Sequence, residues 1–345
     1  MEQLTCVIPG LIVDFKDIPL AEYKRQMDIV NVEKLLARSR VKKLTRTGSV
    51  GLFSHLFNLE GAELAEAPIA RLGEGAKADS QWWLRLDPVY FQADRDNVLM
   101  MGNECLDISL DEAQALALEL SHHFSDLGWH LEVLHPKRWY LSLPEPPEIE
   151  TYDLRHVQGK HIFDFLPYGP QGRQWHGLLN EMQMLLHASS INSTRVSQGK
   201  LPINALWLWG GGRLPEIQRQ AYRCYGGGVY EQGMAKLAGM AAESEMTDYE
   251  TLKLSEEGSH GAIVFLDELQ QALMAQNLDQ WVHALNHLEQ RWFAPIRADL
   301  RNKRLNKLTL FAGDSCLFES NSKDQRRFWM RRQSLLDYAA QYAER

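Results

Sequence analysis

The stretch INSTRVSQGKLPINALWLWGGG, residues 191–212, constrains the fold more than any other part of the chain. Residues 204–209 (NALWLW) are almost continuously apolar, which is typical of a strand buried on both faces of a sheet in an α/β protein. In open parallel sheets, ligands bind beyond the carboxyl ends of the strands. We therefore expect Trp209, the glycines 210–212 and Arg213 to lie near a binding site. A tight turn under a bulky Trp explains the same glycines equally well.

The length of 345 residues predicts two domains, or one domain with an insertion. A hydrophobic content of 45% and a charged content of 24% are those of a globular protein. No apolar run approaches the ~20 residues of a membrane span, and the first residues do not resemble a signal peptide. We expect a cytoplasmic protein that does not contact membranes. The four cysteines lie far apart without a CxxC pair, which predicts buried free thiols.

Strands alternate with helices at both ends of the chain. Expected strands are residues 4–13, 223–228, 261–266 and 307–312, and expected helices are 31–40, 229–242, 269–294 and 324–343. Residues 81–143 read as β-β-α-β-β, and a capping box formed by Ser109 and Glu112 starts the helix. This order predicts a doubly wound, mostly parallel α/β sheet with an inserted smaller α+β domain. The expected core is 1–75 with 201–345, joined through a connection at 60–75, and the expected inserted domain is 76–200.

Several motifs resemble the archaeal-type cofactor-independent phosphoglycerate mutases of the alkaline phosphatase superfamily. Arg195, Gly199, Pro202, Asn204 and the glycine run are similar to a characteristic run of that family, and WLRLDPVYF resembles the start of its inserted domain. The segments LLNEMQMLLH, INALWLWGGG and LDPVYF are also similar to a bacterial branch of RpfE-type regulatory proteins. The resemblance implies an alkaline phosphatase-like core.

Catalytic members of that superfamily use two divalent metals, held by Asp and His, with a Ser or Thr nucleophile. The resemblance places Ser49 and Ser54 in the nucleophile loop. Candidate metal ligands for manganese, zinc or magnesium are Asp14, Asp267 and Asp314.

This chain departs from the family pattern at three places. Pro9-Gly10 ends the first strand where Asp-Gly is expected, Gly313-Asp314-Ser315 stands where Asp-His-Ser is expected, and no Gly-His pair follows Leu269. We therefore expect a degenerate, non-catalytic protein that needs no cofactor and acts as a regulatory or binding module. An active metal-dependent phosphoglycerate mutase is the alternative.

A module of this kind needs a partner. We expect a protein or a small anionic metabolite, bound near a set of polar and aromatic residues: Asn192, Arg195, Asn204, Trp209 and Arg213. Asn192 and Arg195 can equally hold the loop before the strand, since a guanidinium bridges several carbonyls.

Two further motifs carry weaker alternatives. Arginines interleave with aromatic residues near the C-terminus, and they are Arg326, Arg327, Arg331 and Arg332. This pattern is typical of nucleic-acid binding, but it also arises where arginines occupy the solvent-exposed face of a helix. His283 and His287 have the spacing of a zinc pair, but Ala284 replaces the glutamate of the metalloprotease motif, so a solvated helix face explains them better.

Overall fold

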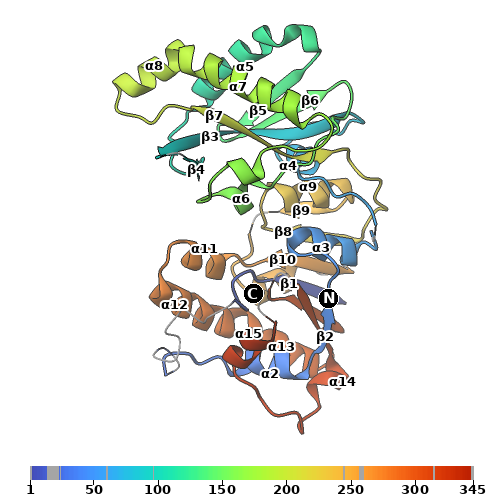
Figure 1. Cartoon of the computed structure of the whole chain (residues 1–345). Coiled ribbons are helices and arrows are strands. Elements are labelled where there is room, and N and C mark those ends of the chain that lie inside the picture. Colours follow the sequence, from blue (N-terminus) through green and yellow to red (C-terminus); the bar gives the residue numbers. More distant parts are fainter. Residues whose placement is uncertain are drawn as a thin grey trace. The chain divides into compact units, whose positions relative to one another are not determined.

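The computed structural model describes residues 2–13, 23, 25–59, 61–95, 97–243, 245–255, 260–313 and 315–342. The chain divides into two compact units, one formed by 1–62 with 217–345 and the other by 63–216 (Figure 1). The second unit thus begins earlier and ends later than the expected 76–200. No helix among the described residues is long and apolar enough to cross a membrane.

The first unit is built on a seven-stranded sheet in the order β2-β12-β11-β1-β10-β8-β9. Neighbouring strands from β11 to β9 run parallel, whereas β12 and β2 are antiparallel to their neighbours. The strands are β1 (Gln3–Val7), β2 (Arg40–Lys43), β8 (Tyr222–Tyr225), β9 (Ala241–Glu243), β10 (Gly261–Phe265), β11 (Lys307–Phe311) and β12 (Cys316–Asn321). The mostly parallel sheet confirms the predicted fold class, although β2, β9 and β12 were not expected.

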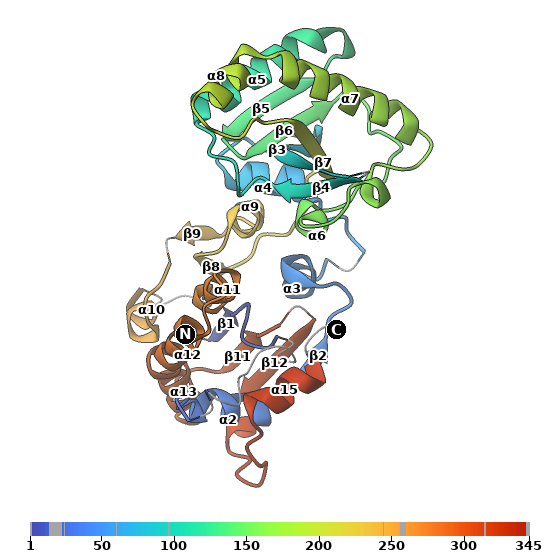
Figure 2. The same ribbon diagram turned by 60° about the vertical axis from the view of Figure 1, so that its left-hand side comes forward.

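Helices cover both faces of this sheet (Figure 2). They are α2 (Val30–Arg38), α3 (Gly48–Leu56), α9 (Val229–Leu237), α10 (Tyr249–Ser255), α11 (Glu268–Met274), α12 (Leu278–Leu288), α13 (Ala294–Arg301), α14 (Ser322–Gln325) and α15 (Leu335–Tyr342). Cys6 of β1 packs with α2, α12 and α13, whereas Phe265 of β10 faces Phe53 of α3, with ring centroids 6.4 Å apart. Because successive strand residues point to opposite faces, these contacts define the two layers.

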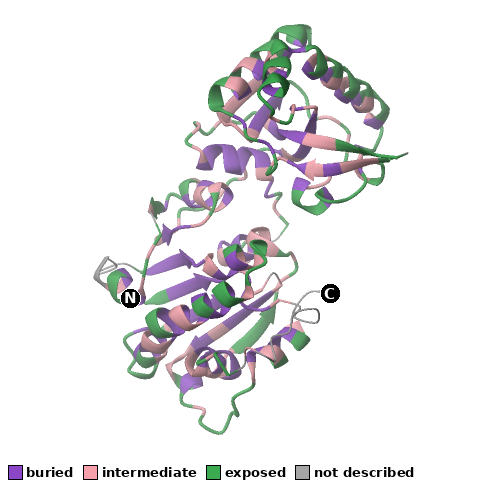
Figure 3. Cartoon of the chain, turned by 90° about the vertical axis from the view of Figure 1, so that its left-hand side faces the viewer, coloured by how far each residue is buried: buried purple, intermediate pink, exposed green. Residues whose placement is uncertain are grey.

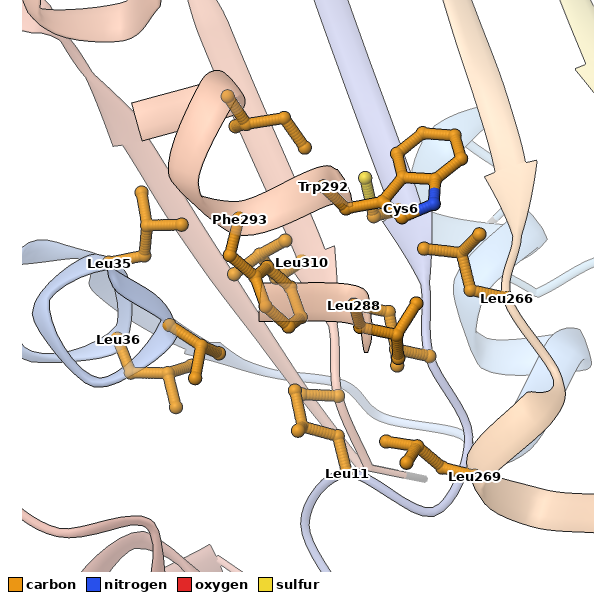
Figure 4. Packing of buried hydrophobic residues seen from close by; sticks show 14 of the residues in the cluster. Cys6, Leu11, Leu35, Leu36, Leu266, Leu269, Leu288, Trp292, Phe293 and Leu310 are labelled. Atoms are coloured by element: carbon orange, nitrogen blue, oxygen red, sulfur yellow. The ribbon is translucent and has the colours of Figure 1, made fainter. Parts of the chain in front are cut away.

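A π-helical turn, Glu289–Phe293, joins α12 to α13 and shapes the larger core. The turn places the adjacent side chains Trp292 and Phe293 together among leucines from α2, β11 and α11 (Figure 4). Its carboxylate Glu289 accepts hydrogen bonds from the backbone N–H groups of Asn31 (2.6 Å) and Val32 (3.0 Å). A buried acid therefore caps α2, which has no side-chain cap of its own.

The expected closing helix over 324–343 is wrong, because two short helices occupy this segment. Asn321 caps α14, and the side chains of Ser334 and Asp337 each accept from the other's backbone N–H at the start of α15. Two caps define two helix starts, so residues 326–334 between them are not helical.

The second unit holds a five-stranded sheet in the order β4-β3-β6-β5, with β7 also paired to β3. Its strands are β3 (Trp82–Asp94), β4 (Asn97–Gly102), β5 (His130–His135), β6 (Arg138–Leu143) and β7 (Ala205–Gly212). Its helices are α4 (Glu66–Gly73), α5 (Leu110–His123), α6 (Leu154–Val157), α7 (Gly172–Ala188) and α8 (Ser190–Ser197), with short 3₁₀ turns at Ser125–Leu127 and Phe163–Phe165. The predicted β-β-α-β-β order and the Ser109–Glu112 capping box are confirmed.

Strand β7 does not join the parallel sheet, which corrects the interpretation of NALWLW. It runs antiparallel to β3 in the second unit, and α4 occupies the segment expected to be a connection. A strand buried on both faces produces the same apolar run in either sheet, so the pattern could not distinguish them. Figure 3 shows the buried face of α4 and the buried strands of both sheets.

Cys6, Cys224 and Cys316 are buried as expected, whereas Cys105 is exposed.

Candidate functional site

The carboxyl edge of the seven-stranded sheet is the place where its fold would position a site, because β11, β1, β10 and β8 all end there. Ser49 lies in the first turn of α3, and Asp267 lies between β10 and α11. Asp14 and Asp314 follow β1 and β11 in sequence but lie outside the described residues. The described candidates at this edge are therefore Ser49 and Asp267.

Ser49 is hydrogen-bonded to a residue that sequence reasoning missed. Its Oγ donates to Glu231 Oε1 at 2.5 Å, and Glu231 lies in the first turn of α9. Gly226 and Gly227, both with positive φ, lead into that helix, and a Cβ on Gly227 would stand 2.8 Å from the Glu231 Cβ. The glycines allow Glu231 to approach the strand end closely. The sequence signal for this contact was a run of glycines followed directly by a helix with an acidic residue in its first turn.

The electrostatics of this edge are negative. The pKa of Asp267 is raised to about 6, first by burial and then by the charges of Glu231 and Glu245. Its side chain makes no hydrogen bond to the start of α11, which it precedes. A carboxyl group in these surroundings is disfavoured as an anion, and part of it is protonated near neutral pH.

Ser54, the second candidate nucleophile, is directed elsewhere. It lies in the same helix as Ser49 but is buried, and its hydroxyl has no hydrogen-bond partner among the described residues. Two side chains five positions apart on a helix lie on different faces, so Ser49 and Ser54 cannot both contact one substrate. The structure brings Ser49, and not Ser54, to Glu231.

The family resemblance implies a pair of divalent metals at this edge, held by carboxylates and imidazoles. Among the described residues, no three His, Cys, Asp or Glu side chains are grouped so that they could hold a metal ion. At the end of β1, the Gly10 carbonyl instead accepts from Trp281 Nε1 at 3.0 Å. Ser315 Oγ lies 3.9 Å from Cys316 Sγ. The described residues therefore do not fit a metal pair.

Two histidines contact glutamates, and one of them, His287, belongs to the pair singled out by spacing. His287 Nδ1 lies 3.4 Å from Glu268 Oε2 on the neighbouring α11. In the second unit, His123 Nε2 lies 2.6 Å from Glu181 Oε1. Each contact joins two helices of one unit.

Three of the expected ligand-binding residues bond to the backbone around β7. Asn192 donates to the carbonyls of Leu186 and Ile203 and accepts from Ile203 N–H. Asn204 accepts from and donates to the backbone of Phe91, at 2.7 and 2.8 Å.

Arg195, the third of them, is only 1% exposed. It donates twice to the Leu201 carbonyl and once to that of Asp107, and it pairs with Glu112 at 3.0 Å. These contacts support the structural interpretation of the loop.

Trp209, expected beside a ligand, belongs to a buried charge network in the second unit. Its Nε1 donates to Asp87 Oδ2 at 2.9 Å, and Arg85 pairs with the same carboxylate through two nitrogens, at 2.9 and 2.8 Å. Burial raises the pKa of Asp87, and the Arg85 charge opposes that shift. Charged residues inside the apolar run WLRLDPVYF were the signal for this pair.

The glycines 210–212 and Arg213 complete the expected site. The glycines form the end of β7 instead of a loop, and Arg213 donates to the Ser80 carbonyl. An added Cβ would stand 2.4 Å from the Trp82 ring at Gly211 and 2.3 Å from the Ala65 Cβ at Gly212. Because these glycines have no Cβ, Trp82 packs closely on Gly211, and Ala65, which precedes α4, packs closely on Gly212.

Comparison with known sequences gives partial matches. No known family model matches the chain. Over 103 residues it is 27% identical to the 2,3-bisphosphoglycerate-independent phosphoglycerate mutase of Methanosarcina barkeri, covering 29% of this chain and 26% of that one. Over 63 residues it is 36% identical to the corresponding protein of Methanothrix thermoacetophila, covering 18% and 16%. The matched segments therefore span about a quarter or less of these relatives' lengths.

Comparison with solved structures covers the whole chain. The cofactor-independent phosphoglycerate mutase of Thermoplasma acidophilum superposes with a TM-score of 0.53 at 15% identity, covering 100% of this chain and 95% of that one. The PH0037 protein of Pyrococcus horikoshii superposes with a TM-score of 0.61 at 12% identity, covering 99% and 92%. The chain therefore has the alkaline phosphatase-like fold of the cofactor-independent phosphoglycerate mutases and is related to their archaeal type over part of its sequence.

Proposed function

We propose that this chain is a degenerate phosphoglycerate-mutase-like protein that lacks mutase turnover and acts as a regulatory or binding module, as the RpfE-type resemblance implies. The observation that carries the proposal is the Ser49–Glu231 hydrogen bond beside Asp267. The candidate nucleophile is held by a carboxylate at the edge where a metal-dependent mutase needs cations.

The charge at this edge supports the proposal. The charges that act on Asp267 are those of Glu231 and Glu245, and both are negative. A phosphoryl group carries negative charge that metals or guanidinium groups neutralise during transfer. Beside Ser49, it would instead meet carboxylates of like charge.

The mutase assay tests this proposal directly. We expect the purified protein to give no interconversion of 3- and 2-phosphoglycerate above the protein-free rate, with manganese, zinc or magnesium added. The Thermoplasma acidophilum mutase serves as the positive control. Each lost electrostatic contact to a transition state costs on the order of a hundredfold in rate, so several losses together remove measurable turnover.

Serine variants separate the proposal from its rival. Ser49→Ala and Ser54→Ala should leave the background rate unchanged. Metal-dependent turnover that Ser49→Ala abolishes would reject the proposal and identify an active phosphotransferase. Metal analysis of the active preparation would then show whether Asp14, Asp267 or Asp314 contributes to binding, through its Asn variant.

A second candidate function rests on residues 326–332. Phe328 is 83% exposed and Trp329 66% exposed, and their rings meet edge to face at 5.3 Å. Arg327 pairs with Asp324 at 3.0 Å and Arg332 with Glu33 at 2.8 Å. Arg326 and Arg331 are exposed, and no ion pair is found for either among the described residues. Exposed aromatic rings beside arginines suit stacking on the bases of single-stranded nucleic acid.

Binding to a labelled single-stranded oligonucleotide tests the second function. We expect affinity to fall as salt rises, because bound counterions are released on binding. Trp329→Ala should weaken binding on the order of tenfold, since each base–aromatic stack contributes about 1–3 kcal/mol. Met274→Ala, also at an exposed apolar residue, is the matched control. Equal affinity in both variants would reject this function.

A further inference from the structure

The second unit contains a cavity of about 460 Å³ that the proposed function does not use. Its volume lies within the range of small-molecule pockets, about 300–1,000 Å³. Its lining residues come from the second 3₁₀ turn and the residues that flank it, from the residue before β7, and from β3, β4, β7 and α7, which are labelled in Figure 1. Most of its lining residues are apolar, and three of them are aromatic: Phe91, Phe163 and Trp207.

Aromatic rings on the wall favour a flat ligand. The rings of Phe91 and Trp207 meet edge to face at a centroid distance of 6.4 Å. Phe163 lines the same cavity and is 55% exposed. Trp207 is only 2% exposed, so a bound ring would cover Phe163 and the partly exposed Phe91. Aromatic pairs contribute beyond the area they bury.

Two amides supply the hydrogen-bonding groups. Asn180 and Gln183 line the cavity from positions i and i+3 of α7, so they lie on one side of that helix. Neither side chain forms a hydrogen bond within the part of the chain that the structure describes. The other polar lining groups are engaged, since His176 contacts the Pro167 carbonyl and Asn204 contacts Phe91. Two free amides offer both donors and acceptors to a ligand.

The residues of the wall favour an uncharged ligand. No Lys, Arg, Asp or Glu is among the residues that line the cavity. An ion entering it would lose hydration without gaining a partner of opposite charge. We propose that this cavity binds an uncharged planar heterocycle that stacks on the aromatic wall and hydrogen-bonds to Asn180 and Gln183.

Competition against the neutral dye Nile red tests the proposal on the full chain. We expect saturable fluorescence enhancement by the protein, displaced by adenine, a neutral heterocycle, but not by benzoate, a flat anion. Ala93→Trp should weaken dye binding strongly, because Ala93 is an exposed lining residue and the indole would occupy part of the cavity. Met184→Ala, 73% exposed on α7 and outside the lining, is the matched control and should bind the dye normally.

The amides have their own test. Asn180→Leu and Gln183→Leu should keep dye binding but weaken adenine competition about fivefold each, the effect of one net hydrogen bond. Circular dichroism melting of every variant checks that the fold persists. Dye binding unchanged by Ala93→Trp in a folded protein would overturn the site. Displacement by benzoate as strong as by adenine, or adenine competition unchanged in both Leu variants, would overturn the ligand class.

Discussion

At the scale of single residues, the polar side chains before β7 are hydrogen-bonded to the backbone of their own unit. Arg195 and Asn192 bridge carbonyls and N–H groups that would otherwise be buried without partners. An unpaired buried polar group costs about 1–3 kcal/mol, so each side chain stabilises the loop that leads into the strand.

Replacing Arg195 by Lys should lower the melting temperature. An ammonium group cannot reproduce the planar fork that contacts Leu201, Asp107 and Glu112, and the loss of two such bonds costs about 2–4 kcal/mol. Thermal unfolding of Arg213→Lys is the control, since Arg213 is exposed and donates to one carbonyl. A stable Arg195→Lys protein that has lost binding of a ligand would instead make this arginine functional.

Asp267 should make stability depend on pH. Its folded pKa, about 6, lies above the usual 3.8, so the native state holds the proton more tightly than the unfolded chain. Its contribution to stability is therefore present below pH 4 and is lost as pH rises through 6. The melting temperature of wild type minus that of Asp267→Asn should fall between pH 4 and pH 7. A constant difference would show that burial and the neighbouring acids do not shift this group.

At the scale of elements, the glycines at the end of β7 are required by packing against neighbouring residues. Gly212→Ala should destabilise the protein, because the new Cβ would stand 2.3 Å from the Ala65 Cβ. Overpacking of this kind costs about 1–3 kcal/mol. Gly177→Ala on α7 is the matched control, since nothing lies within 4 Å of its Cβ position. It should stabilise the helix by about 1 kcal/mol. Urea unfolding measures both, and equal effects would reject the packing argument.

At the scale of the whole molecule, the unit 63–216 has its own cores on both sides of its sheet. We expect a fragment of residues 63–216 to unfold cooperatively in urea. The fragment 76–200, with the boundaries expected from sequence, should not, because it lacks α4 and β7 and leaves β3 with one long edge unpaired. Cooperative unfolding of both fragments would show that α4 and β7 are dispensable for the unit.

Local sequence patterns determined much of the secondary structure of this protein. The Ser109–Glu112 capping box, the β-β-α-β-β order and the alternation of strands with helices were readable because each depends on neighbours in sequence. The tertiary structure alone decided which sheet takes NALWLW, because burial on both faces is the same pattern in a parallel and in an antiparallel sheet. It also decided that Ser49 meets Glu231, 182 positions away. No local signal encodes such a contact, since Ser49 lies in α3 and Glu231 in α9, and only the folded unit brings these two helices together.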